Sequence, residues 1–251
     1  MARLARLAIA NYQHHILQRG NDNRVIFQDA DDIALFRKVL LEGSRKYDVA
    51  IHAYVFMPTH FHLLVTPKTD DGIGKMMQWI GRHYVPYFNK KVQRAGTLWQ
   101  GRFKSLVIES AEYFLLCSRY IETNPVRAGL AQSPMDYADS SCLHHIGQRI
   151  DNLITDHPLY WNLGNTPFQR EVAYRELLEQ ALTLRQINEF TAASLKGWPV
   201  GSSHFKVGLE KQASRRIAPL KRGRPRTKKV LVDDEVASDS EQLASSTDQV
   251  Q

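Results

Sequence analysis

Two histidines on either side of a phenylalanine, His60-Phe61-His62, carry the clearest chemical signal in the sequence. They open an apolar run that ends at Val65 and predicts a β-strand, and the two-residue period of a strand sends both imidazoles out of one face. Two such rings can hold one metal ion. An isolated His-x-His has low specificity, but polar rings on so apolar a strand are unfavourable without a partner. The other histidine pairs, His14-His15 and His144-His145, lack a comparable setting.

A tyrosine and an asparagine downstream, Tyr120 and Asn124, stand four residues apart in a helical pattern. They share one helix face and could meet the same metal, which points to phosphoryl transfer with a tyrosine nucleophile. Arg119 and Arg127 flank the tyrosine and could hold phosphates or lower the pKa of the phenol. Two other interpretations stay open, because Tyr120 also fits a core aromatic and Asn124 also fits the last residue of a helix before proline.

The ligand types indicate which metal the site would take. Two imidazoles and an uncharged amide leave the positive charge of a metal ion largely uncompensated. Such a site suits Mg²⁺ or Mn²⁺ bound to a phosphate oxygen, because the anionic substrate supplies the missing charge.

The charge distribution of the 251-residue chain points to a polyanion. The formal net charge is +7, yet residues 233–251 contain six acids and neither Lys nor Arg. The rest of the chain has 33 basic and 20 acidic residues, a net charge of +13. Nucleic acid is the simplest partner for this surplus, and a solubilising surface is the alternative.

Cysteine usage and hydropathy bear on the compartment. The two cysteines, Cys117 and Cys142, support neither a disulfide framework nor a structural zinc cluster. No apolar run approaches the roughly 18 residues of a membrane span. We therefore expect a protein of the cytoplasm, associated with the nucleoid and not with a membrane.

The elements that would position these residues follow an order of β-α-β-β-α-β plus a further helix. This order predicts an α+β, ferredoxin-like (RRM-like) fold, an antiparallel sheet with helices on one face and with the first and third strands in its centre. The histidine pair then lies on a central strand, and the last helix can lie across the exposed face. We expect strands at 12–17, 49–57, 60–66 and 106–108, and helices from about Asp29 to Tyr47, at 72–92 and at 110–124.

Beyond this core the pattern weakens. Residues 146–210 predict a mostly helical C-terminal extension with a loop at 156–160 and a helix at 172–190, and we find no chemistry in it. A basic segment at 211–232 contains Arg222-Gly223-Arg224-Pro225, and an acidic tail at 233–251 is predicted to be disordered. The basic segment resembles an AT-hook core, whose arginines would enter the minor groove of A·T-rich duplex, or is a solvated phosphate-binding tail.

Four blocks of the sequence occur in a fixed order. They are Arg19-Gly20-Asn21, the segment 57–65 (MPTHFHLLV), the segment 98–104 (LWQGRFK) and the segment 119–130 (RYIETNPVRAGL). Together these blocks resemble the single-tyrosine HUH transposases, and more narrowly the REP-associated tyrosine transposases, over about residues 10–145. We therefore expect a transposase domain at 1–145.

The resemblance implies roles for particular residues. His60 and His62 would hold a divalent metal, Tyr120 would attack a phosphate of single-stranded DNA to leave a 5′-phosphotyrosine and a free 3′-hydroxyl, and Asn124 would be the third metal ligand. The expected enzyme is a metal-dependent endonuclease and strand transferase that cleaves at hairpin-forming REP-type repeats. Candidate DNA contacts are Arg19, Asn21, Arg102, Lys104, Arg119, Arg127, Arg222 and Arg224.

Two other functions compete with this interpretation. The first is a non-catalytic regulator that binds nucleic acid on the same scaffold, and the second is a metal hydrolase that uses water in place of tyrosine. The protein would act as a monomer or a homodimer.

Overall fold

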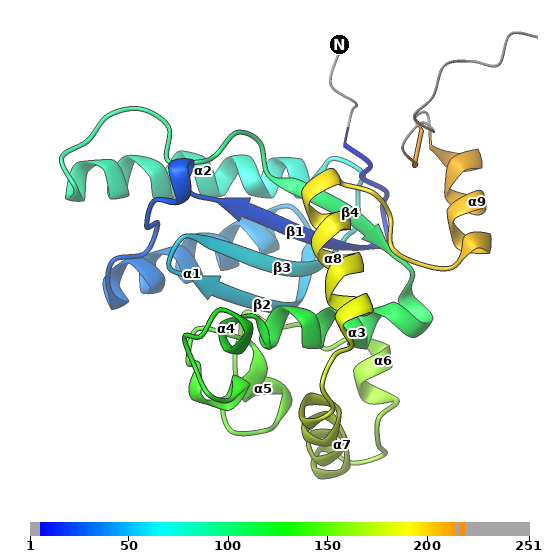
Figure 1. Cartoon of the computed structure of the whole chain (residues 1–251). Helices are drawn as coiled ribbons and strands as arrows, with labels where there is room; N and C mark the ends of the chain where they lie inside the picture. The colour runs from blue at the N-terminus through cyan, green and yellow to red at the C-terminus, as the bar shows by residue number, and fades with distance from the viewer. Residues whose placement is uncertain (1–5, 214–215, 219–251) are drawn as a thin grey trace, which may run out of the picture. The chain divides into compact units, whose positions relative to one another are not determined.

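A four-stranded antiparallel sheet lies at the centre of the computed structural model, which describes residues 6–213 and 216–218 (Figure 1). The strand order is β2-β3-β1-β4, so that the first and third strands are central. The predicted ferredoxin-like topology and the central place of the histidine strand are confirmed. The strands are β1 (Gln13–Arg19), β2 (Val49–Met57), β3 (His60–Pro67) and β4 (Lys104–Ile108).

Two long helices, α1 (Ala30–Lys46) and α2 (Gly72–Lys91), cover one face of the sheet and lie behind it in Figure 1. Asp29 caps α1, because its carboxylate accepts the backbone N–H of Asp32 at 3.2 Å. Phe36 of α1 and Tyr84 of α2 pack with Phe61 of β3 in the larger hydrophobic core. This face of the sheet therefore packs the larger hydrophobic core.

The opposite face carries α3 (Ser110–Glu122) and α8 (Leu184–Lys196), which lie in front of the sheet in Figure 1. Phe190 of α8 and Phe114 of α3 pack in a second core with Leu64, Leu106 and other strand residues. A helix such as α3 was predicted across this face, and α8 was not.

The C-terminal extension departs from the sequence-based expectation in two places. The helix predicted at 172–190 is wrong, because two helices, α7 (Pro167–Glu179) and α8, replace it. The break follows from a capping box, in which Thr183 and Gln186 exchange side-chain and backbone hydrogen bonds at the start of α8. The loop predicted at 156–160 contains a short helix, α6 (Pro158–Trp161).

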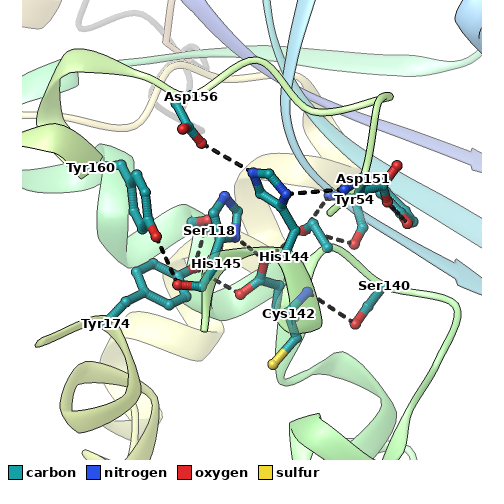
Figure 2. Close-up of polar contacts among 12 residues, drawn as sticks. Tyr54, Ser118, Ser140, Cys142, His144, His145, Asp151, Asp156, Tyr160 and Tyr174 are labelled. Atoms are coloured by element: carbon teal, nitrogen blue, oxygen red, sulfur yellow. Dashed lines mark hydrogen bonds and ion pairs between the residues drawn. The ribbon is translucent and has the colours of Figure 1, made fainter. Parts of the chain in front are cut away.

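The remaining elements are short, and α4 and α5 lie near the end of α3. They are the one-turn helix α4 (Asn124–Arg127), α5 (Cys142–His145), α9 (Ser203–Gln212) and 3-10 turns at Asn21–Asn23 and Pro134–Asp136. The fully buried Glu122 carboxylate accepts hydrogen bonds from Ser141 Oγ at 2.5 Å, His145 Nδ1 at 2.6 Å and Tyr174 Oη at 2.7 Å. Figure 2 shows His145 of α5 and Tyr174 of α7 side by side in this network. Glu122 therefore ties α3 to both helices.

The described residues fall in one compact unit, which ends at Ala218. None of their helices is long and apolar enough to cross a membrane. The acidic tail and most of the basic segment, including Arg222 and Arg224, lie outside the described residues.

Candidate active site

The sheet register places the two histidines in neighbouring rows of one face. His62 of β3 pairs with Leu17 of β1, which in turn pairs with Lys104 of β4. His60 pairs with Arg19 at the end of β1. Because directly paired residues point to the same side, all five side chains belong to the face that carries α3 and α8. The histidine rings lie 5.2 Å apart between centroids.

Both nitrogens of His62 have partners, one on each side. Nε2 lies 3.0 Å from the carboxamide nitrogen of Asn124, and Nδ1 lies 2.7 Å from Nε2 of His15. His15 is fully buried, and its other nitrogen lies 3.1 Å from the hydroxyl of Ser194 on α8. The structure thus brings His62 and Asn124 together as the sequence predicted, and it adds His15 and Ser194.

Tyr120 lies against the histidines with its ring edge-on. The ring centroid is 6.1 Å from that of His62 and 5.8 Å from that of His15, at interplanar angles of 87° and 77°. Only 5 % of the residue is exposed, because Phe190 of α8 stacks on the ring at 5.1 Å. The phenolic oxygen is 3.1 Å from Oγ1 of Thr191. In this structure α8 therefore binds the hydroxyl and packs on the ring, while the ring lies beside His15 and His62.

The two arginines that flank Tyr120 lie in different surroundings. The guanidinium carbon of Arg127 lies 4.4 Å above the tyrosine ring, and one of its nitrogens donates to the Tyr120 carbonyl at 2.7 Å. A cation over an aromatic face is attracted to it, so Arg127 holds the ring in place. Arg119 is buried and donates to the carbonyl of Gln180, which anchors α3 to the chain between α7 and α8.

Burial keeps the histidines neutral, so that their nitrogens can act as metal ligands. Desolvation lowers the pKa of His60 to about 4 and that of His15 to about 3, and it lowers the pKa of His62 well below its usual value. The positive charge of Arg19 adds to the effect on His60 and His62. Neutral imidazoles offer lone pairs to a metal at neutral pH.

These donors fit a divalent cation. Two neutral imidazoles and a carboxamide, which binds metals through its oxygen, form the set His60, His62 and Asn124. Among the described residues, no group of three or more His, Cys, Asp or Glu side chains is placed to hold a metal ion. Two imidazoles and a carboxamide bring no negative charge, and Arg19 Nε is buried without a hydrogen-bond partner among the residues described. A phosphate could compensate the charge of both cations.

The remaining candidate DNA contacts are dispersed. Lys104 is exposed on the histidine side of the sheet. Asn21 lies in the turn after β1, with its amide 3.4 Å from the Asp22 carboxylate. Arg102 lines a cavity of about 860 Å³ beside α2, together with Arg6 and Trp99. That cavity adjoins Gln18 and Ser105 of the sheet, which belong to the face opposite the histidines.

Sequence reasoning missed four residues of the site. His15 was set aside for lack of a suitable setting, and that judgement is wrong, since His15 contacts both His62 and Tyr120. Phe190, Thr191 and Ser194 lie in the extension in which no chemistry was found. Strand alternation was a usable signal for His15, because the residue follows the same two-residue period as Leu17 and Arg19.

Residues 8–124 match the family model described as "Transposase IS200 like", so this segment is similar to a family of DNA-processing enzymes. No curated protein is similar to the chain at a significant level.

The solved structures that are similar to this chain include the following two. The first is a REP-associated tyrosine transposase bound to a REP hairpin, with a TM-score of 0.51 and 19% identity over 62% of this chain and 92% of that one. The second is a putative transposase from Deinococcus radiodurans R1, with a TM-score of 0.33 and 20% identity over 49% of this chain and 97% of that one. The first likeness supports the assignment of the fold.

Proposed function

We propose that this protein cleaves and rejoins single-stranded DNA at hairpin-forming REP-type repeats, with Tyr120 as the nucleophile and a divalent metal as cofactor. The observation that carries the proposal is the position of the Tyr120 ring, edge-on to His62 at 6.1 Å, while His62 Nε2 faces Asn124 at 3.0 Å. Nucleophile and donor set thus lie on one face of one sheet. The REP-hairpin complex of the solved relative supports the choice of substrate.

The reaction forms one bond and breaks one. The Tyr120 oxygen bonds to the scissile phosphorus and loses its proton to solvent, the bond from phosphorus to the 3′-oxygen breaks, and that oxygen takes up a proton. Mg²⁺ or Mn²⁺ held by His60, His62 and Asn124 would polarise the phosphate and stabilise its developing charge. Because the phosphotyrosine diester keeps the energy of the original bond, a 3′-hydroxyl can reverse the step without a nucleotide cofactor.

Residues of this chain also raise the rate by holding the tyrosine ring in position before attack. Arg127 lies over the tyrosine ring and Phe190 stacks on it, so few rotamers remain to be lost before attack. The phenolic oxygen has to leave Thr191 before it can reach a phosphate. Arg19 and Lys104, on the same face, are the contacts to the DNA backbone that we propose first.

A labelled hairpin oligonucleotide tests the proposal. Incubation with Mn²⁺ should yield a protein–DNA adduct on a denaturing gel, and a chelator should abolish it. Tyr120→Phe should remove the adduct and keep DNA binding, because the substitution deletes only the hydrogen bond to Thr191 and leaves the ring packing. Tyr113→Phe, about two helical turns earlier on α3, is the matched control and should form the adduct. An adduct in Tyr120→Phe would overturn the assignment of the nucleophile.

The same gel separates the competing functions. Cleavage without a covalent adduct would indicate a hydrolase that uses water. Binding without cleavage under any metal would indicate a regulator. Both results contradict the proposal.

The basic segment is proposed as an accessory DNA contact, with Arg222 and Arg224 as AT-hook-like residues in the minor groove of A·T-rich duplex. Deletion of residues 211–232 should weaken DNA binding and flatten its dependence on salt, because fewer counterions are released. Unchanged affinity across the salt series would refute this role.

A further inference from the structure

A chain of hydrogen bonds runs from the backbone of α8 to the candidate metal ligands. It connects the Phe190 carbonyl, Ser194, His15, His62 and Asn124, and each contact lies between 2.6 and 3.1 Å. The positions of the hydrogen atoms determine which atom donates and which accepts in each contact. These positions follow from the contact between the Phe190 carbonyl and Ser194.

The serine fixes the direction of the chain. Ser194 Oγ lies 2.6 Å from the Phe190 carbonyl, which can only accept. If the hydroxyl turned its hydrogen toward His15 instead, two acceptor oxygens would face each other at this short distance. The single hydrogen of Ser194 therefore points to the carbonyl, and toward His15 Nδ1 at 3.1 Å the hydroxyl accepts.

The histidines pass this direction on. A neutral imidazole has one N–H and one lone pair, so an N–H at Nδ1 leaves His15 Nε2 as an acceptor. His62 Nδ1, at 2.7 Å, then has to donate. This leaves the lone pair of His62 on Nε2, where the amide N–H of Asn124 meets it at 3.0 Å. Every hydrogen bond in the chain is satisfied in this one direction.

We propose that Ser194 and His15 are positioning residues that hold His62 in the tautomer with its lone pair on Nε2, the atom that would ligate the metal. The inference deepens the proposed function and rests on it for the role of His62. Partners of this kind orient a ligand imidazole and raise its basicity, and their loss weakens metal affinity about 10- to 100-fold. The extension without predicted chemistry would thus set the chemistry of the metal ligand.

Nitrogen NMR of the metal-free protein gives the direct test. With ¹⁵N-labelled histidine, long-range proton–nitrogen spectra distinguish the two tautomers, and the signals of His15 are assigned by their loss in His15→Phe. We expect the Nδ1–H form for both His15 and His62. The Nε2–H form at His62 in the unsubstituted protein would overturn the inference, and this outcome needs no variant to fold.

A substitution at the serine tests causation. Ser194→Ala should give a mixed or reversed tautomer at His62 and should weaken Mn²⁺ binding in calorimetry about 10-fold. Ser44→Ala is the matched control, because Ser44 is also buried in a helix and donates to a carbonyl of its own helix, Leu41, at 2.9 Å. It should change neither readout. Unchanged tautomer and Mn²⁺ affinity in Ser194→Ala would overturn the inference.

The two proposals fail in different ways. If the expected tautomers are seen but Tyr120 forms no adduct, the function is wrong and the hydrogen-bond chain stands. If the adduct forms but His62 carries its hydrogen on Nε2, the function stands and this inference is wrong.

Discussion

Substitution of Glu122 by alanine should destabilise the protein more than the same substitution of an exposed glutamate. Glu122 is fully buried between Tyr120 and Asn124, and its two oxygens accept from three buried donors. Glu122→Ala leaves these donors without their acceptor. The loss therefore acts on the end of α3, close to the proposed nucleophile Tyr120 and to the proposed metal ligand Asn124, which begins α4.

The contacts around Glu122 set the magnitude. Tyr174 Oη has a second partner in Ser118 Oγ at 2.9 Å, and Ser141 Oγ has one in the Tyr54 carbonyl at 3.3 Å. Both hydroxyls can turn to these partners, so the main cost is the unsatisfied N–H of His145 together with the lost charge-assisted bonds. Breaking such a buried pair costs about 3 kcal/mol. For a protein of this size the loss corresponds to a Tm lowered by roughly 6–12 °C.

Denaturant unfolding and a thermal melt measure this effect. Glu176→Ala, an exposed position on α7, is the control and should change stability by less than about 0.5 kcal/mol. Glu122→Gln should lose about 1 kcal/mol, because its amide oxygen can still accept from Ser141 and His145 in place of Oε1. The reasoning fails if Glu122→Ala loses no more stability than Glu176→Ala.

Three further predictions follow from the site and the core. Burial lowers the pKa of His52 to about 4, so protonation favours the unfolded chain and stability falls as the pH drops from 6.5 toward 4. Urea titrations measure the free energy of unfolding at each pH. Between pH 6.5 and 5 this free energy should fall by about 2 kcal/mol less in His52→Gln than in the unsubstituted protein, and an equal fall would contradict the prediction. Thr191→Val should speed adduct formation about fivefold in a quenched time course, because it removes a hydrogen bond of about 1 kcal/mol that restrains Tyr120, whereas a slower rate would show that the threonine assists the attack. Calorimetry should find Mn²⁺ bound about 10-fold more tightly, or about 1.4 kcal/mol, when a single-stranded oligonucleotide is present, since the donors are neutral and Arg19 is nearby; equal affinities would contradict the need for a phosphate.

Local patterns sufficed for the first half of the chain. Apolar alternation and turn residues gave the bounds of β2, and the helical period gave α2 to within one residue. The place of His62 beside Asn124 followed from a resemblance that spans separate blocks, because spacing within each block cannot show that two blocks meet. The position of Tyr120 is compatible with both interpretations, since its ring is buried like a core aromatic and lies edge-on to His62 and His15, and its role as nucleophile stays a prediction.

Contacts between distant residues defeated the sequence reasoning elsewhere. His15 meets His62 across 47 positions and Ser194 across 179, so no window along the chain contains both partners. The break between α7 and α8 had a local signal in Thr183-x-x-Gln186, which the apolar period across it obscured. Burial, which makes the histidines neutral, depends on a helix whose place only the fold reveals.

Because α8 covers part of the sheet, it determines where a truncated fragment for expression can end. A clone that stops near residue 145 keeps the matched transposase segment but loses Phe190 and Ala193, which cover Leu106, Ile108 and Tyr120. Those side chains would then form a continuous hydrophobic surface exposed to water, which promotes aggregation of the purified fragment. A fragment that ends after Val200 keeps α8 and also keeps the β-bridge between Val200 and Ile108 at the sheet edge.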